Sequence, residues 1–264
     1  MILQDIFIYP IKSLGGIRLT EAQVEIPGLA LDRRWMLVDA NGVFLTQRKH
    51  SRMALLRVEL SGNGLTVHNK DHAGQAHFIP FKPETEEWLP VRVWQDEVWA
   101  KPVSARSDRW FSEMLGIPCR LVYMGPSSKR YVEGKYAVNR ETLSFADAMP
   151  YLIIGQGSLD DLNGRLEKPL PMNRFRPSLV FSGGEAFEED CWDRVKIGEC
   201  VFNVTKPCAR CVVTTIDQET GIAGNEPLKT LAKYRSEGNK VMFGQNMIAL
   251  TGGLIKLGDR VQAI

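Results

Sequence analysis

The sequence predicts a mainly β protein with a few short helices. Short apolar or alternating runs dominate its first hundred residues, and turn-forming residues separate these runs. Only three segments combine a helix-starting residue with a later stop signal. Many short strands at such close spacing favour a barrel or a sandwich.

The first strands are expected at residues 6–11, 35–38, 55–60 and 91–99, which are rich in apolar and β-branched side chains. Glycine, proline and asparagine mark the turns between them. The strongest hairpin signal is Asn41-Gly42, because it lies between two apolar triplets and both residue types tolerate the left-handed backbone of a tight turn.

Three segments are predicted as helices. Residues 107–115 carry Asp108 in the first turn and end at Gly116. The other two helices are expected at 158–167, which begins with capping-box spacing, and at 226–237, which has a proline in its first turn. All three are short, so we expect them to pack on sheets.

Strand patterns resume after the first helix, at residues 120–123, 151–154, 178–182, 201–205, 211–216, 247–250 and 260–264. A boundary near residue 105 divides the chain into an N-terminal domain, residues 1–105, and a C-terminal domain, residues 106–264. Neither part contains a glycine-rich strand-to-helix loop for a nucleotide, and no internal repeat is evident.

Composition narrows the classes of partner. The 264 residues include 33 Lys and Arg against 31 Asp and Glu, so a net charge of +2 predicts no general affinity for nucleic acid or for an acidic membrane. The sequence also has no apolar stretch of about 20 residues and no secretory start, which predicts a cytoplasmic protein. Five cysteines, an odd number, indicate reduced thiols.

The most reactive stretch is Pro207-Cys208-Ala209-Arg210-Cys211, in which two cysteines flank an arginine. A neighbouring guanidinium stabilises a thiolate, which is both a nucleophile and a ligand for a soft metal. Three alternatives remain: half of a zinc site, a dithiol-exchange pair, or a structural pair of small apolar side chains. The strand pattern of residues 211–216 argues against dithiol exchange, which requires a helix there.

Three other stretches are rich in groups that bind anions. They are Lys12-Ser13, Asp32-Arg33-Arg34 and Arg174-Phe175-Arg176. Guanidinium groups bind phosphate and carboxylate with two hydrogen bonds, and lysine and serine add a charge and a hydroxyl donor. Together with the cysteine, these stretches predict an anionic ligand whose soft end meets sulfur.

Six motifs in this order make the chain resemble a known family; they are Tyr9-Pro10-Ile11-Lys12-Ser13, Gly28-Leu29-Ala30-Leu31-Asp32-Arg33, Phe175-Arg176-Pro177, Pro207-Cys208-Ala209-Arg210-Cys211 with Thr214-Thr215-Ile216-Asp217, Glu226-Pro227-Leu228-Lys229-Thr230-Leu231 and Phe243-Gly244-Gln245-Asn246. The chain is similar to MOSC-domain proteins with an N-terminal MOSC-associated β-barrel domain, and in particular to the bacterial YcbX type, which is related to the mitochondrial amidoxime reducing component. The resemblance implies a MOSC β-barrel and a smaller N-terminal β-barrel.

The resemblance also implies a molybdenum pyranopterin cofactor, with Cys211 as the protein ligand to the metal. Lys12, Ser13, Arg33, Arg176 and Asn246 are the implied contacts to the pterin and its phosphate. Asp147, in Ser144-Phe145-Ala146-Asp147, is implied near the metal as a catalytic residue.

The activity implied by the family is reduction of N-hydroxylated compounds such as hydroxylamines, amidoximes and hydroxylated nucleobases, a detoxification reaction. Relatives of the YcbX type commonly continue into a ferredoxin-like domain, but this sequence has no Cys-x₄-Cys-x₂-Cys spacing, so we expect no iron–sulfur cluster in this chain. The expected electron donor is a separate ferredoxin or flavoprotein. The alternatives are a sulfur or cofactor carrier that uses Cys211, and a β-barrel binding module without catalysis.

A few polar and aromatic residues are expected to have no part in the site. The four histidines, His50, His68, His72 and His77, are expected to be solvated. The tryptophans at 88, 94, 99, 110 and 192 are expected to fill cores or cap barrel ends, and Lys129-Arg130 is expected to be an exposed pair.

Overall fold

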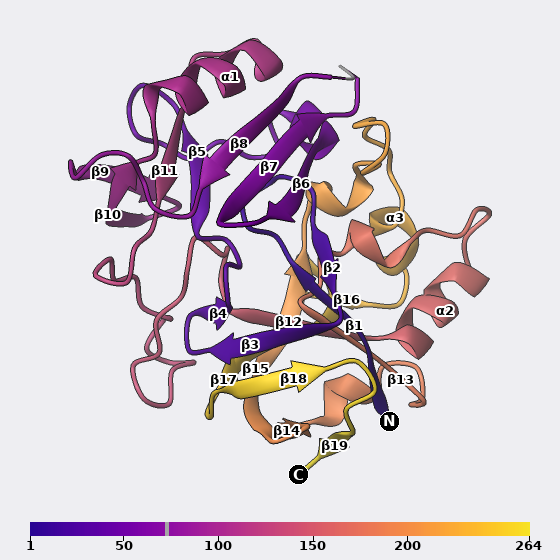
Figure 1. Cartoon of the computed structure of the whole chain (residues 1–264). Helices are drawn as coiled ribbons and strands as arrows, with labels where there is room; N and C mark the ends of the chain where they lie inside the picture. Colours follow the sequence, from indigo (N-terminus) through magenta and orange to yellow (C-terminus); the bar gives the residue numbers. More distant parts are fainter. Residues whose placement is uncertain (72–73) are drawn as a thin grey trace.

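The computed structural model describes residues 1–71 and 74–264, and it is built mainly of strands (Figure 1). In this part of the chain the largest sheet has nine strands in the order β19-β14-β15-β17-β12-β13-β1-β2, with β16 beside β17. Their bounds are Val261–Ala263 (β19), Arg194–Ile197 (β14), Cys200–Arg210 (β15), Lys240–Ala249 (β17), Tyr151–Gly155 (β12), Leu179–Ser182 (β13), Ile2–Ile8 (β1), Ile17–Leu19 (β2) and Ser236–Glu237 (β16). The predicted fold class is confirmed.

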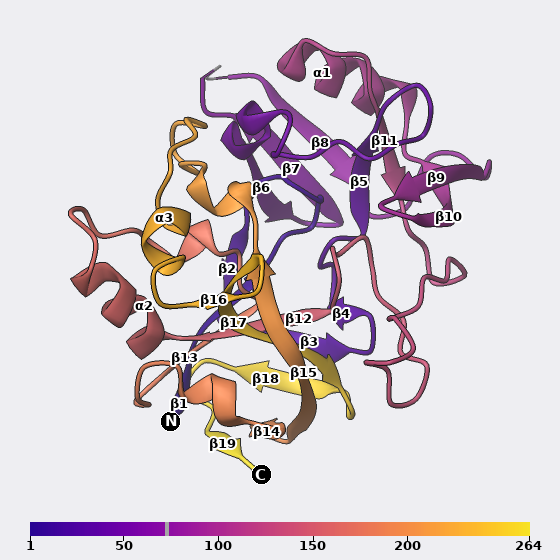
Figure 2. The ribbon, with the colours of Figure 1, turned by 180° about the vertical axis from the view of Figure 1, so that it is seen from behind.

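The first strand of the chain belongs to the sheet that the C-terminal half forms. β1 pairs antiparallel with β13, and Ile2 forms a bridge with Arg260. A small sheet of β3 (Glu21–Glu25), β4 (Gly28–Leu29) and β18 (Gly253–Lys256) joins both ends of the sequence again. Figure 2 shows the two termini on the same side of the molecule. The domain boundary at residue 105 stays a prediction, and the two ranges share one sheet and one buried core.

Two other sheets lie at the opposite end of the molecule, with helix α1 above them (Figure 1). They consist of β6 (Leu56–Ser61), β7 (Gly64–Asn69) and β8 (Ala76–Pro80), and of β5 (Trp35–Val38), β11 (Arg120–Tyr123), β10 (Asp96–Pro102) and β9 (Leu89–Val93). β11 follows α1 and pairs with β5. Phe111 of α1 and Trp35 of β5 are fully buried in the same core, so the first helix packs with the N-terminal strands.

Helix α1 (Ala105–Leu115) ends just before Gly116, as predicted, but it begins two residues before the predicted start at Ser107, because Ser104 is its cap. Ser104 accepts a hydrogen bond from the Ser107 amide at 3.1 Å, and Gly116 adopts the left-handed conformation with φ 68°. Helix α2 (Gln156–Gly164) also lies near its predicted range.

The predicted helix over residues 226–237 is wrong in length, because α3 spans only Leu228–Leu231. The next residues turn back and pair with β17, since the Met242 amide donates to the Arg235 carbonyl at 2.8 Å. Four 3-10 segments complete the described elements: η1 (Ser51–Leu55), η2 (Met172–Arg174), η3 (Glu188–Cys191) and η4 (Val212–Thr215).

The predicted hairpin at Asn41-Gly42 is confirmed, since Val38 faces Phe44 and Gly42 has φ 72°. The single strand predicted at 91–99 is instead the hairpin β9–β10, because Trp94 adopts φ 58° and reverses the chain. The strand predicted at 6–11 ends earlier, at Ile8, just before a proline without an amide donor.

His77 is buried, which corrects the expected exposure: its Nε2 lies 2.9 Å from Ser107 Oγ and its ring stacks on Trp110. His72 lies outside the described residues. Trp88, Trp94 and Trp99 are exposed rather than buried in a core. In the ranges that the structure describes, no helix is both long and apolar enough to cross a bilayer.

Candidate functional site

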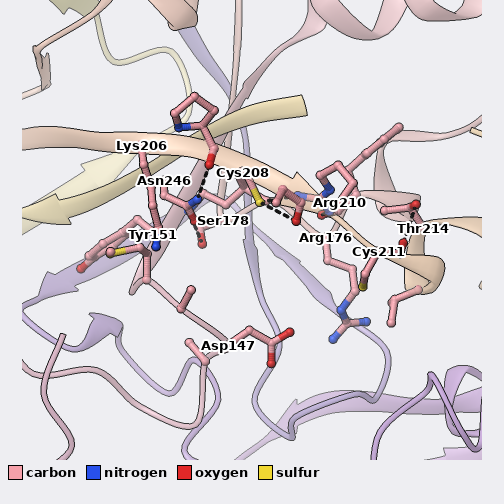
Figure 3. Close-up of a pocket in the computed structure, with 18 of the residues that line it drawn as sticks. Asp147, Tyr151, Arg176, Ser178, Lys206, Cys208, Arg210, Cys211, Thr214 and Asn246 are labelled. Atoms are coloured by element: carbon pink, nitrogen blue, oxygen red, sulfur yellow. Dashed lines mark hydrogen bonds between the residues drawn. The ribbon is translucent and has the colours of Figure 1, made fainter. Parts of the chain in front are cut away.

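A cavity of about 630 Å³ is lined by residues from both halves of the chain. Its volume is in the range of small-molecule and cofactor sites. The seven side chains selected from the sequence all line it: Lys12, Ser13, Arg33, Asp147, Arg176, Cys211 and Asn246. Figure 3 shows several of them around the cavity. The structure therefore brings the predicted residues together, while the role of each one stays a prediction.

Strand pairing explains why these distant residues meet. β1 and β13 are antiparallel, and the Phe7 amide donates to the Ser178 carbonyl at 2.8 Å. The residues after β1, which include Lys12 and Ser13, therefore lie beside the residues before β13, which include Arg176. β12 runs parallel to β13, so Asp147, which precedes β12, lies near the same edge.

Both cysteines of the pair are free thiols that line the cavity. Cys208 Sγ accepts a hydrogen bond from Arg210 Nη1 at 2.9 Å. Cys211 Sγ instead accepts one from Arg48 Nε at 3.3 Å. The guanidinium expected from the sequence therefore serves Cys208, and a different arginine serves Cys211.

The strand predicted over residues 211–216 is wrong, because β15 ends at Arg210 and η4 follows Cys211. Two threonine hydroxyls explain the change. Thr214 Oγ1 donates to the Cys211 carbonyl at 3.0 Å, and Thr215 Oγ1 donates to the Val212 carbonyl at 2.8 Å. These local hydrogen bonds compete with a strand ladder. Cys208, the first cysteine of the pair, lies inside β15 and not at a helix N-terminus, so the structure still argues against dithiol exchange.

The cavity is strongly cationic. Among the described residues, seven Lys and Arg side chains line it, against Asp147 and Glu237. The guanidinium groups of Arg33 and Arg176 lie 4.7 and 4.1 Å from the ring centre of Tyr9. Burial lowers the pKa of Arg176 to about 10, and the nearby Arg33 charge acts in the same direction. Such a surplus of buried positive charge fits an anionic ligand.

Backbone strain is concentrated at the same place. In the described part of the chain, seven residues other than glycine have a left-handed φ, and four of them line the cavity: Ser13, Arg33, Trp94 and Arg176. Their φ angles are 67°, 51°, 58° and 53°. This conformation is costly for side chains with a Cβ, and it is found where a fold must aim a group at a ligand.

Asp147 lies at the mouth of the cavity and forms an ion pair with the buried Lys12. It also accepts hydrogen bonds from Trp94 Nε1 at 3.2 Å and from Arg48 Nη2 at 3.4 Å. Burial alone would raise the pKa of Asp147, but Lys12 and Arg48 outweigh this effect and hold it well below its usual range. Asp147 is therefore ionised at neutral pH.

Lys12 has the opposite character. Burial lowers its pKa to about 8, although Asp147 opposes the shift. Its Nζ also donates to the Phe145 carbonyl at 2.7 Å. Lys12 can therefore hold or lose a proton close to neutral pH.

The loop that carries Asp147 is held by Arg130, and the predicted exposure of this residue is wrong. Arg130 is buried, and its Nε donates to Asp96 at 2.6 Å. Its other nitrogens donate to the carbonyls of Ser144 at 3.1 Å and Asp147 at 3.2 Å. Long-range carbonyl acceptors of this kind have no local sequence signal.

Asn246 lines the cavity from β17, and its Nδ2 donates to the Pro207 carbonyl at 3.3 Å. β15 departs from regular pairing with β17 at this point, between Pro207 and Ala209. Asn246 thus supports the irregular strand that presents Cys208.

Sequence reasoning missed Arg48 and Trp94, whose guanidinium and ring lie 4.3 Å apart. It also missed Tyr9 as the aromatic partner of two arginines, and Lys206, whose Nζ lies 3.8 Å from the ring centre of Tyr136. None of these pairs is local in sequence. In residues 1–71 and 74–264, no group of three His, Cys, Asp or Glu side chains is arranged to hold a metal ion.

The fold and the site together define a β-rich protein whose cationic cavity contains two free thiols and suits an anionic ligand. Comparison with known families is more specific: a MOSC domain matches residues 140–262, and a MOSC N-terminal beta barrel domain matches residues 1–118. The chain belongs to the family of MOSC-domain proteins with this N-terminal domain, which includes the mitochondrial amidoxime-reducing components. The resemblance predicted from the motifs is confirmed.

Curated relatives agree with this family. The chain is 33% identical to mitochondrial amidoxime-reducing component 1 of Mus musculus, over 97% of this chain and 80% of that protein. It is 32% identical to the protein of the same name from Homo sapiens, over 97% and 81%. It is also 32% identical to molybdenum cofactor sulfurase of Arabidopsis thaliana, over 92% of this chain and 32% of that protein.

Proposed function

We propose that the protein is a molybdenum-cofactor-dependent reductase of N-hydroxylated compounds. One observation carries the proposal: the free thiol of Cys211 lines the same cavity as Arg33 and Arg176, whose guanidinium groups both lie against the ring of Tyr9. Relatives named amidoxime-reducing components, which align over most of their length, support the same reaction class.

The residues of the cavity fit such a cofactor. Cysteine sulfur is a suitable ligand for a soft metal, and Cys211 supplies a free one in the cavity. Arg33, Arg176, Lys12 and Ser13 would hold the phosphate and the pterin, since their charges and hydroxyl match an anion. Arg210 Nε is buried and has no hydrogen-bond partner among the described residues, so it has a donor to offer.

When bound, the cofactor would supply oxygen-atom transfer coupled to a two-electron change. The overall reaction consumes an N-hydroxyl compound, two electrons and two protons, and releases the amine-type product and water. A separate ferredoxin or flavoprotein would deliver the electrons.

The chain's own groups divide the remaining tasks. Asp147 is ionised, so its part is to hold Lys12, Arg48 and Trp94 around the mouth of the cavity rather than to donate a proton. Lys12 Nζ, with a pKa of about 8, is the group that can carry a proton there.

The test compares Cys211→Ser with Cys208→Ser, expressed in a host that makes the pterin cofactor. We expect Cys211→Ser to lose molybdenum and the reduction of a benzamidoxime-type substrate. Cys208→Ser, the matched control, is expected to retain metal. Normal molybdenum content and full turnover in Cys211→Ser would exclude the proposal.

A second candidate function is a sulfur or cofactor carrier that uses Cys211. The similarity to molybdenum cofactor sulfurase favours it, and a thiolate also carries sulfur. Sulfane sulfur that can be transferred from protein without metal would support the carrier. Substrate reduction with a redox-active metal would support the reductase.

A further inference from the structure

Two buried glutamines connect two loops that contribute residues to the cavity lining. Gln47 is 1% exposed and Gln218 is 4% exposed. Their side-chain amides are reciprocal partners: Gln47 Nε2 donates to Gln218 Oε1 at 3.3 Å, and Gln218 Nε2 donates to Gln47 Oε1 at 3.2 Å. An amide has two donors and an acceptor oxygen, so each side chain can hold one more backbone group.

Each glutamine uses this capacity on a loop of the site. Gln47 Nε2 donates to the Ser13 carbonyl at 2.7 Å, and Gln218 Nε2 donates to the Ile216 carbonyl at 3.1 Å. The first bond reaches the loop after β1, and the second reaches the segment after Cys211. The glutamine pair thus joins the loop of Lys12 and Ser13, which is predicted to bind phosphate, to the segment that follows Cys211.

Residues of the N-terminal strands fix the position of Gln218 from outside. Arg57 of β6 donates to the Gln218 carbonyl at 2.9 Å. Arg57 and Lys70 both form ion pairs with Glu219. Gln47 therefore bonds to a glutamine, Gln218, whose backbone is already held by Arg57.

The residue after Gln47 is Arg48, whose guanidinium lies on the sulfur of Cys211 at 3.3 Å. An arginine side chain loses rotamer entropy when it is held in one conformation. Trp94 supports its guanidinium from one face, and Asp147 accepts from one of its nitrogens. The backbone from which the side chain starts is held by other contacts: the Arg48 amide donates to Thr46 Oγ1 at 3.3 Å, and the adjacent Gln47 side chain ties this turn to the two loops.

We infer that Gln47 and Gln218 are positioning residues that hold the Arg48 guanidinium at the sulfur of Cys211, and that Arg48 there favours negatively charged groups at this sulfur. The inference relies on the proposed function only for the identity of Cys211 as the working sulfur. It adds two residues, outside the cavity lining, that set the charge next to that atom.

The test measures how the charge of a reagent affects its rate at Cys211. The full chain, prepared without cofactor, is alkylated with iodoacetate, which is an anion, and in parallel with iodoacetamide, which is neutral. Trypsin cleaves after Arg210 and so separates Cys211 from Cys208 for quantification by mass spectrometry. The rate with iodoacetate is divided by the rate with iodoacetamide. This ratio cancels the thiolate fraction common to both reactions, so a high ratio reports positive charge near the sulfur.

We expect Arg48→Gln to lower the ratio about tenfold, as loss of one nearby partly screened charge predicts. Gln47→Met and Gln218→Met should each lower it by roughly threefold, because Arg48 remains in the chain but is less well held. Gln47→Met added to Arg48→Gln should lower it no further, since the glutamine acts through the arginine.

Two comparisons separate positioning from a loss of stability. The double variant Gln47→Met, Gln218→Met leaves neither amide without its partner, so it should be more stable than a simple sum of the single losses predicts, and its ratio should stay low. Gln245→Met is the matched control. Gln245 is equally buried and donates to Asp190 at 2.7 Å, away from Arg48, so its loss should leave the ratio unchanged.

An unchanged ratio in Gln47→Met and Gln218→Met, or an equal fall in Gln245→Met, would overturn the inference. So would an unchanged ratio in Arg48→Gln. None of these outcomes depends on metal content, so they are distinct from a failure of the proposed reductase activity.

Discussion

Replacement of Asp147 by asparagine tests the electrostatic interpretation of the cavity. Asp147 is the ion-pair partner of Lys12, a buried ammonium whose pKa is already lowered to about 8 by burial. Asparagine keeps the size of the side chain and removes its charge. Lys12 then loses the attraction that opposes burial, so its pKa must fall further.

The size of the effect follows from distance and exposure. Opposite charges 4 Å apart attract by about 4 kcal/mol at an effective dielectric constant of 20 and by about 1 kcal/mol in water. The Asp147 side chain is 54% exposed, so solvent screens the pair and an intermediate value applies. About 1.4 to 2.7 kcal/mol corresponds to a downward move of about one to two pH units in the titration of Lys12.

The assay is calorimetric titration with sulfate, an anion whose charge is constant between pH 5 and pH 9. Lys12 is charged below its pKa of about 8 and neutral above it. The wild type should therefore bind sulfate more tightly at low pH, and its affinity should fall as the pH rises through about 8. In Asp147→Asn the fall should be centred about one to two pH units lower. At pH 5, below the midpoint expected for either protein, the variant should bind at least as tightly as the wild type, because a negative charge has gone.

Lys12→Met is the control, and its affinity profile should lack this fall. The same midpoint in Asp147→Asn and in the wild type would refute the reasoning, since it would show that the Asp147 charge does not act on Lys12.

Two other predictions concern the backbone and the stacked arginine. Gly244→Ala should destabilise the fold by about 3 kcal/mol in urea unfolding, because φ is 77° and a Cβ would lie 2.6 Å from Ile154 Cγ1. Gly238→Ala, with φ 55° and open space, should cost only about 1 kcal/mol, and equal losses would contradict this explanation. Arg176→Lys should lose about tenfold in sulfate affinity, since an ammonium cannot stack a planar fork on Tyr9, and full retention would show that charge alone is sufficient.

Local chemistry made part of the fold predictable. The signal at the C-terminal end of α1 is Gly116, whose amide donates to the Ser112 carbonyl four residues earlier. The turn at Asn41-Gly42 is equally local. Where a feature depends on neighbouring residues alone, the sequence pattern was sufficient.

Other elements were decided by distant partners. Residues 226–237 begin with good helix signals, yet their last two residues, Ser236–Glu237, form β16 and pair with β17. The segment after Cys211 has the β-branched composition of a strand, but its threonine hydroxyls bond to preceding carbonyls and turn it into η4. Propensity is a weak preference, and tertiary pairing or a side-chain hydrogen bond overrides it.

The site shows the same division. The cysteine pair and the stretches around Lys12, Arg33 and Arg176 were visible in the sequence because thiols and anion-binding groups are clustered there, and the family motifs added Asp147 and Asn246. Arg48, Trp94 and the glutamine pair were missed because an arginine, a tryptophan or a glutamine in a loop is ordinary until the fold gives it a partner. The missing information was the set of contacts between loops.

The arrangement of the strands has a consequence for how the site forms. Lys12 lies after β1, the first strand, and Cys211 lies after β15, but both strands belong to one sheet whose order mixes early and late segments. The N-terminal residues therefore reach the cavity only when β1 has paired with β13. A ligand that contacts both groups must stabilise the whole assembled sheet rather than either half. The cavity is thus a product of the complete fold, and loss of the β1–β13 pairing would remove Lys12 and Ser13 from the site while leaving Arg176 and the cysteine motif in place.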